Sequence, residues 1–237
     1  NSLPGPENTT RAILPNGIPV LARSNFKSPS VVASGYLQCG GLFDPDEKLG
    51  LADFTASALL RGTQQRNFQE IYNSLESVGA NLSIEGSTHS IGFGGKALAE
   101  DLGLLLGLVS EAFRQPAFPE VQVERLRAQI MTRLAMRAQD TGEMANLAFD
   151  SLVYANHPYQ RSEEGYPETI QAISRDDLVE FHRRYFGPTG MVIAVVGAVE
   201  PHKAVEMVAE MLGDWRNPEQ PGPPALPEVT RLTETRR

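Results

Sequence analysis

Three residues of the stretch GLADFTASALLRGT are spaced so that they could share one site. Asp53, Ala56 and Ser57 stand at positions i, i+3 and i+4, which lie on one face of a helix. Imidazole side chains at i and i+4 of such a face bind one zinc ion. The carboxylate of Asp53 can bind a cation, but Ser57 is a poor neutral ligand and Ala56 has no group that accepts a proton. The spacing alone therefore allows these three residues to share one site but does not identify its chemistry.

The neighbouring helices determine how this stretch is held. The turn FDPDEK precedes a helix predicted from about Lys48 to Arg61, which Gly62 ends. A second helix begins after Asn67, whose side chain forms a predicted capping box with Glu70. Five further helices are predicted over about 98–113, 119–138 and 141–154, in SRDDLVEFHRRYFGP and in EPHKAVEMVAEMLGDW.

The predicted strands come in pairs between these helices. Pro15-Asn16-Gly17 separates two short apolar runs, which indicates a hairpin. SVVASGYLQCG and MVIAVVGAV are typical of buried strands, and ANLSIEGSTHSIGFGGKAL predicts two strands or one long bent strand. This order predicts an α+β fold in which helices pack on one face of a mostly antiparallel sheet. We expect this domain to span residues 1–215, followed at 216–237 by a proline-rich linker that leads to a second half.

Composition excludes several classes of protein. The chain is 41% hydrophobic and 21% charged, as in ordinary globular domains. A net charge of −8 without a basic stripe argues against nucleic-acid binding. Cys39 is the single cysteine, which excludes an internal disulfide and a cysteine-based zinc site, and we interpret it as a buried core residue. No apolar run is long enough to span a membrane, so we expect a soluble chain, either cytoplasmic or exported with its signal removed.

The four histidines do not cluster in the sequence. The patterns around them place His89 in a strand, His157 in a loop between helices, His182 on a solvated helix face and His202 in the first turn of the last helix. A zinc site needs three or four converging ligands, so we interpret each of them as structural. The G-x-S-x-G, phosphate-loop and H-E-x-x-H motifs are absent.

The order of the motifs along the chain is more specific than any one of them. Five segments follow one another in this order: LPNGIPVLA, GGLFDPDEKLGLADFTASALLRGT, NFQEIYNSLESVGANLSIEGSTHSIGF, LAEDLGLLLGLVSEAFRQPAFPEVQVERLRAQIM and YANHPYQRSEEGYPETIQAISRDDLVEFHRRYFGPTGMVIAVVGAVEP. This order resembles the N-terminal half of the pitrilysin/insulinase family of inverted-zincin metallopeptidases, which includes the mitochondrial processing peptidases. The resemblance runs from about Arg11 to Trp215.

The resemblance assigns a role to each position of the opening stretch. In that family the helix carries H-x-x-E-H, whose two histidines bind zinc and whose glutamate is the general base. Asp53 falls at the first histidine, Ala56 at the glutamate and Ser57 at the second histidine, while Arg133 falls at the third ligand, a glutamate on a later helix. All four positions are changed, so we expect no zinc, no other cofactor and no catalytic residue. We expect instead that Arg133 reaches Asp53 and forms an ion pair, the alternative being that both side chains point into solvent.

The resemblance also implies an architecture and a partner. Family members are built of two related halves that enclose a chamber, and a substrate peptide binds as an added strand at a sheet edge. That edge strand falls on residues 80–93, where Ser83, Ile84, Glu85 and Gly86 depart from the family's usual motif. The family includes non-catalytic subunits, so we expect an inactive homologue that forms a heterodimer with an active metallopeptidase subunit or a chamber with its own second half. A stand-alone peptide-binding or scaffold module, and an active zinc peptidase with unrecognised ligands, remain as alternatives.

Overall fold

Six strands form one sheet in the computed structural model of the chain, which describes residues 5–229. The strands are β1 (Thr10–Ile13), β2 (Pro19–Ser24), β3 (Ser30–Leu37), β4 (Asn81–Gly86), β5 (Ile91–Leu98) and β6 (Val192–Gly197). They lie in the order β1-β2-β6-β3-β5-β4, and every neighbouring pair is antiparallel except β2 with β6. The mostly antiparallel sheet is therefore confirmed, and β4 is one of its two edges.

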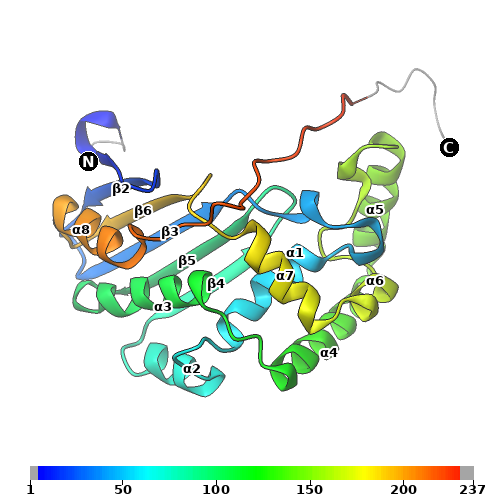
Figure 1. Cartoon of the computed structure of the whole chain (residues 1–237), viewed down its shortest axis with the longest axis horizontal. Helices are drawn as coiled ribbons and strands as arrows, with labels where there is room; N and C mark the ends of the chain where they lie inside the picture. The colour runs from blue at the N-terminus through cyan, green and yellow to red at the C-terminus, as the bar shows by residue number, and fades with distance from the viewer. Residues whose placement is uncertain (1–4, 230–237) are drawn as a thin grey trace.

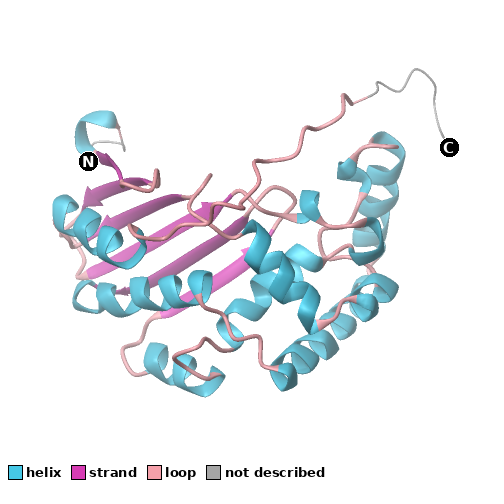
Figure 2. Cartoon of the chain, in the orientation of Figure 1, coloured by secondary structure: helices cyan, strands magenta, loops and turns pink. Residues whose placement is uncertain are grey.

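The helices gather on one face of this sheet and beyond its β4 edge (Figures 1 and 2). They are α1 (Leu51–Ala58), α2 (Phe68–Glu76), α3 (Leu102–Arg114), α4 (Glu120–Arg137), α5 (Thr141–Val153), α6 (Pro167–Ala172), α7 (Arg175–Tyr185) and α8 (Pro201–Leu212). Helix α8 packs on β2, α3 packs on β5, and α1 packs on β4. The predicted α+β fold with helices on one face is confirmed, and none of the helices in the described range is long and apolar enough to cross a membrane.

Alternating side chains explain why only one face is covered. Val31 and Ala33 of β3 are fully buried beneath the helices, whereas Val32 and Tyr36 on the same strand are exposed on the other face. A period of two residues puts consecutive side chains on opposite sides of a strand. Burial of the inward set stabilises the helix layer by roughly 1.5–3 kcal/mol for each large aliphatic side chain.

The start of α1 is fixed by a buried carboxylate rather than by helix propensity. Asp44 is 5% exposed, and its two oxygens accept hydrogen bonds from the backbone N–H groups of Gly50 and Ala52, both at 2.9 Å. Gly50 has φ +92°, and a Cβ there would lie 2.8 Å from the carbonyl oxygen of Glu164. The predicted single helix from Lys48 to Arg61 was therefore too long: α1 covers only 51–58, between two short 3₁₀ turns at 46–48 and 59–61.

Replacing Asp44 by Ala is expected to lower the free energy of unfolding by roughly 2–3 kcal/mol, because two buried N–H donors lose their acceptor. Chemical denaturation followed by circular dichroism measures this loss. Asp46→Ala, two residues along the same turn, is the control, because that side chain is 80% exposed. Equal stability of the two variants would show that Asp44 does not hold the start of α1.

Local signals located most of the remaining elements. Asn67 and Glu70 form the predicted capping box, and Ser174 caps α7. The stretch ANLSIEGSTHSIGFGGKAL forms the two strands β4 and β5 rather than one bent strand. The backbone turns back at 87–90, where the N–H of Ser87 donates to the carbonyl oxygen of Ser90 at 2.8 Å. Helix α3 begins at Leu102, later than predicted, after a 3₁₀ turn at 99–101.

Two histidines lie elsewhere than predicted. His89 is in the turn between β4 and β5 rather than in a strand, and its Nε2 lies 3.0 Å from the hydroxyl oxygen of Tyr159. His182 is half-buried rather than on a solvated face, because it lies on the side of α7 that carries the buried residues Leu178 and Phe181. Its Nε2 donates to the carbonyl oxygen of Phe113 at 2.8 Å, and burial lowers its pKa to about 4.

The segment after α8 stays in contact with the domain for a few residues. Trp215 is buried, and Asn217 donates from its amide to the backbone carbonyls of Arg183 and Phe186. From Pro221 to Val229 the chain then runs extended, away from the helices (Figure 1). The last part of the predicted linker, 230–237, lies outside the described residues, and a domain boundary at 215 stays a prediction.

Candidate functional site

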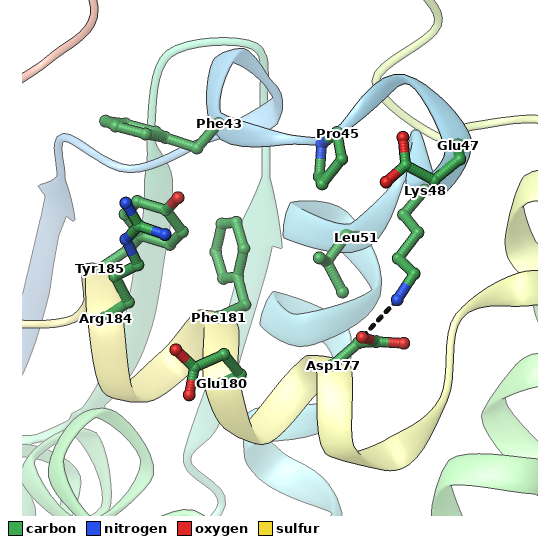
Figure 3. A pocket seen from close by; sticks show the side chains of 10 residues that line it. All are labelled: Phe43, Pro45, Glu47, Lys48, Leu51, Asp177, Glu180, Phe181, Arg184 and Tyr185. Atoms are coloured by element: carbon green, nitrogen blue, oxygen red, sulfur yellow. Dashed lines mark hydrogen bonds and ion pairs between the residues drawn. The ribbon is translucent and has the colours of Figure 1, made fainter.

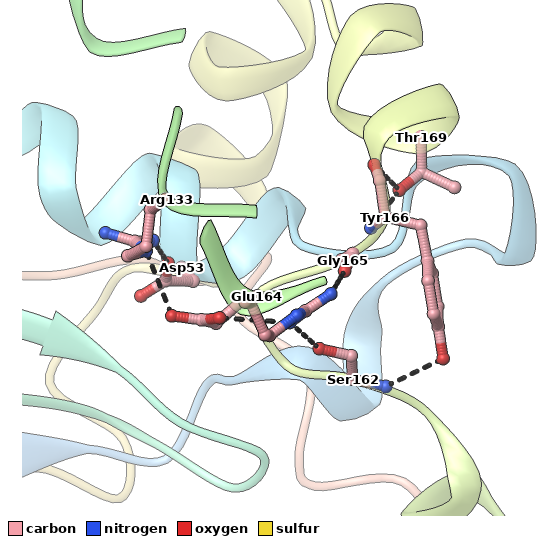
Figure 4. Close-up of polar contacts among 8 residues, drawn as sticks. Asp53, Arg133, Ser162, Glu164, Gly165, Tyr166 and Thr169 are labelled. Carbon is pink, nitrogen blue, oxygen red and sulfur yellow. Dashed lines mark hydrogen bonds and ion pairs between the residues drawn. The ribbon is translucent and has the colours of Figure 1, made fainter. Parts of the chain in front are cut away.

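Helices α1 and α4 bring Asp53 and Arg133 together, although 80 positions separate them in the sequence. The Nη2 of Arg133 donates to Oδ2 of Asp53 at 3.2 Å (Figure 4). The expected ion pair therefore forms, and the alternative in which both side chains point into solvent is wrong. The contact also shows that position 133 of α4 faces position 53 of α1, as the resemblance requires.

A second carboxylate completes the arrangement. Glu164 lies in the loop before α6, and its Oε1 is 3.0 Å from Nε of Arg133 while its Oε2 is 3.0 Å from Nη1 of Arg137. Arg137 also donates to Oγ of Ser162 and to the carbonyl of Gly165 (Figure 4). The sequence did not predict Glu164 or Arg137 as site residues, because nothing in the loop RSEEGY marks which acidic side chain turns toward α4.

The network is partly shielded from water. The side chain of Asp53 is 16% exposed and that of Arg137 is 11% exposed, whereas Arg133 is 46% exposed. Burial raises the pKa of Asp53 to about 6, the positive charge of Arg133 opposes that rise, and the negative charge of Glu164 adds to it. Asp53 is therefore mostly ionised at neutral pH.

The other two positions of α1 carry neither an imidazole nor a carboxylate. Ala56 is 1% exposed and packs in the core, and Ser57 is half-buried. The zinc ion that the resemblance implies does not fit this set, because the one carboxylate on α1 is bonded to a guanidinium of fixed positive charge. Within residues 5–229 no three His, Cys, Asp or Glu side chains converge to hold a metal ion.

The edge strand β4 ends at this network. A Cβ on Gly86 would lie 2.6 Å from Cα of Asp53, so the strand approaches α1 as closely as glycine allows. Ile84 points into the core, while Ser83 and Glu85 are exposed on the opposite face. The four residues assigned to peptide binding thus lie on a real sheet edge beside Asp53, and their binding role stays a prediction.

An open groove adjoins the network on the side of α4 and α5. It has a volume of about 710 Å³ and is lined by Arg133, Arg137, Asp140, Glu143 and Glu164, among others. A neighbouring hollow of about 320 Å³ shares Arg137, Glu143 and Glu164 with it. The exposed side of Arg133 therefore faces open space that solvent can enter.

A second cavity lies beside the start of α1, on the side of α7. It has a volume of about 160 Å³ between the 43–48 turn and α7, with the aromatic rings of Phe43, Phe181 and Tyr185 along it (Figure 3). Lys48 and Asp177 form an ion pair at its rim. None of its lining residues belongs to the Asp53–Arg133 network, so the two sites are separate.

Family models match most of the chain. Residues 20–165 match the model described as Insulinase (Peptidase family M16), and residues 172–237 match the model described as Peptidase M16 inactive domain. The first match alone spans more than half of the chain.

Similar proteins include both peptidases and subunits of larger complexes. A probable mitochondrial-processing peptidase subunit beta of Arabidopsis thaliana is 25% identical over 88% of this chain and 39% of its own length. The cytochrome b-c1 complex subunit 1 of Mus musculus is 24% identical over 86% of this chain and 42% of its own length. An uncharacterized zinc protease of Mycobacterium leprae is 26% identical over 86% of this chain and 46% of its own length. The chain thus spans less than half the length of these relatives.

Solved structures share the fold. A peptidase M16 inactive domain from Pseudomonas fluorescens superposes with a TM-score of 0.80 at 22% identity, covering 94% of this chain and 53% of the other. The periplasmic protease PqqL of Escherichia coli gives a TM-score of 0.85 at 19% identity, covering 96% of this chain and 26% of the other. The inactive-domain match and the similarity to cytochrome b-c1 complex subunit 1 support a non-catalytic domain of this type. The chain belongs to the insulinase family of peptidases, family M16.

Proposed function

We propose that this chain is a catalytically inactive family M16 domain that serves as the non-catalytic partner of an active metallopeptidase subunit, or as one wall of a chamber formed with its own second half. The carrying observation is the Asp53–Arg133 ion pair at 3.2 Å, at positions where the resemblance puts two zinc ligands. A guanidinium cannot be deprotonated in a protein, so its charge opposes any metal ion there.

The missing base supports the same conclusion. Hydrolysis by a metal-bound water needs a group that takes a proton from that water. Ala56 stands at the position of that group, and its methyl side chain is buried. Helix α1 therefore carries neither the imidazoles that bind zinc in the family nor the base that would take a proton from a metal-bound water.

Retained peptide binding is supported by the position of β4. An edge strand presents unpaired backbone N–H and C=O groups, and an added peptide strand pairs with them largely independently of side chains. β4 has a partner on one side only, and Ser83 and Glu85 leave its outer face polar. Loss of catalysis would leave this property intact.

The role as a partner is supported by the names of the relatives. The mitochondrial-processing peptidase subunit beta and cytochrome b-c1 complex subunit 1 are both described as subunits. This chain covers 39% and 42% of their lengths, so a further half from the same chain or from a partner is needed to match either of them.

Co-purification from the source organism, combined with a hydrolysis assay, tests the proposal. We expect the chain to bind a family member that carries an intact H-x-x-E-H motif, or its own second half, and to cleave no peptide alone. Stoichiometric zinc with chelator-sensitive cleavage by the pure chain would overturn the proposal. Peptide binding without such a partner would favour the stand-alone peptide-binding module.

Peptide binding at β4 is expected to slow amide hydrogen exchange along that strand. Pairing with an added strand protects backbone N–H groups that are otherwise open to water. Exchange followed by mass spectrometry with and without a saturating peptide measures the effect. Strand β1 at the opposite edge is the internal control and should not change; equal protection of both edges, or of neither, would contradict binding at β4.

A further inference from the structure

Two carboxylates from different segments converge on one guanidinium. Asp53 of α1 contacts Nη2 of Arg133 at 3.2 Å, and Glu164 of the loop before α6 contacts Nε of the same side chain at 3.0 Å. Arg133 itself belongs to α4, so a single cation joins three segments that are distant in the sequence (Figure 4). Divalent metal ions join protein segments in the same way, by drawing acidic side chains to one positive centre.

The carboxylates are held in place by other contacts as well. Oε2 of Glu164 is fixed by Arg137, which also donates to Ser162 and Gly165. Asp53 is fixed by its place on α1, against Gly86 of the edge strand. Both side chains are more than half shielded from water, at 16% and 33% exposed. Without Arg133, two partly shielded negative charges would therefore lie close together without a counter-charge between them.

We propose that Arg133 is the resident cation of a two-carboxylate site, cross-linking α1, α4 and the 161–166 loop as a metal ion would, and that a hard divalent cation can replace it when the guanidinium is removed. Oxygen ligands suit manganese or calcium rather than zinc, which prefers nitrogen and sulfur. Arg133 is 46% exposed and lines the groove of about 710 Å³, so an entering ion could keep several bound waters. The inference does not depend on the proposed partner role, because it concerns the folded chain alone.

Arg133→Met tests the site by thermal unfolding and isothermal titration. We expect the melting temperature to fall by on the order of 5 °C, because a partly buried carboxylate pair loses its counter-charge. Millimolar manganese should recover part of that loss, and titration should find one manganese ion bound per variant chain and none per wild-type chain. Arg183→Met is the matched control: Arg183 pairs with Glu180 and Glu219 on the exposed surface, so neither a fall nor a manganese response is expected.

A double variant separates the charge effect from a packing effect. Arg133→Met with Asp53→Asn should be more stable than Arg133→Met alone and should no longer respond to manganese, since one of the two carboxylates is gone. Arg133→Lys keeps the positive charge, so it should fold and bind no manganese even if Arg133→Met does not fold. The proposal is overturned if the wild-type chain binds manganese as tightly as Arg133→Met, if Arg133→Met keeps full stability without a manganese response, or if Arg133→Lys binds manganese.

Discussion

A chain that carries Asp53→His, Ala56→Glu, Ser57→His and Arg133→Glu together is expected to bind one zinc ion per molecule. Positions 53 and 57 are one helical turn apart on α1, so two imidazoles there can reach one ion. Position 133 of α4 already reaches position 53, as the 3.2 Å contact between Asp53 and Arg133 shows. The variant would thus supply three converging ligands and leave a fourth position for water.

The expected affinity lies in the range of other three-ligand protein sites. A dissociation constant on the order of micromolar or below corresponds to about 8 kcal/mol or more of binding free energy. Elemental analysis after dialysis, followed by competition with a chelator, measures the stoichiometry and the affinity. The wild-type chain treated in the same way should retain no stoichiometric zinc.

The variant that keeps Arg133 but carries the three changes on α1 is the informative control. It has both imidazoles on α1 and the glutamate at position 56, but it keeps a guanidinium where the full variant has its third ligand. We expect it to bind zinc at least a hundred-fold more weakly, since one ligand is missing and a fixed positive charge remains beside the ion. Zinc binding by both variants with equal affinity would show that position 133 supplies neither a ligand nor an opposing charge; a folded quadruple variant without zinc would show that the four positions do not form one site.

The sequence predicted the Asp53–Arg133 pair because a resemblance aligned two distant segments. No period or spacing joins positions 53 and 133, and the contact was expected only because both fall on positions that share one metal ion in relatives. Glu164 and Arg137 had no such alignment to indicate them. Their contacts with Arg133, Ser162 and Gly165 depend on how the loop before α6 folds back on α4, which only the tertiary structure reveals.

The strands were predicted well for a physical reason. Alternation along β3 and the apolar run of β6 reflect burial on one face or both, and burial is what the sequence encodes most directly. The start of α1 was missed because it depends on Asp44, whose carboxylate satisfies backbone donors six and eight residues later. Such a contact leaves no periodic signal.

His182 shows how a local charge pattern can mislead. Its neighbours Arg183 and Arg184 are exposed, and the predicted solvated face followed from them. The helical period gives the better answer, because Leu178 precedes His182 by one turn: Leu178 is buried, and His182 on the same side of α7 is half-buried. The period of a short helix therefore outweighs the charge of adjacent residues when a single side chain is placed.

His182 is expected to make the domain less stable in mild acid. Burial lowers its pKa in the folded chain from 6.5 to about 4. The unfolded chain therefore binds a proton that the folded chain rejects, so the contribution of this side chain is fully present above pH 6.5 and is lost as the pH falls toward 4. A difference of between two and three pH units corresponds to about 3 kcal/mol.

His182→Gln is expected to remove that contribution to the pH dependence. The glutamine amide can donate to the carbonyl of Phe113 in place of Nε2 but cannot take up a proton. Urea denaturation between pH 7 and pH 4 should show that the wild-type chain loses about 3 kcal/mol more than this variant over the interval. His202→Gln is the control at the exposed start of α8, and its curve should follow that of the wild type. Parallel curves for wild type and His182→Gln would mean that the imidazole is protonated within the folded domain and that its hydrogen bond to Phe113 survives the added charge.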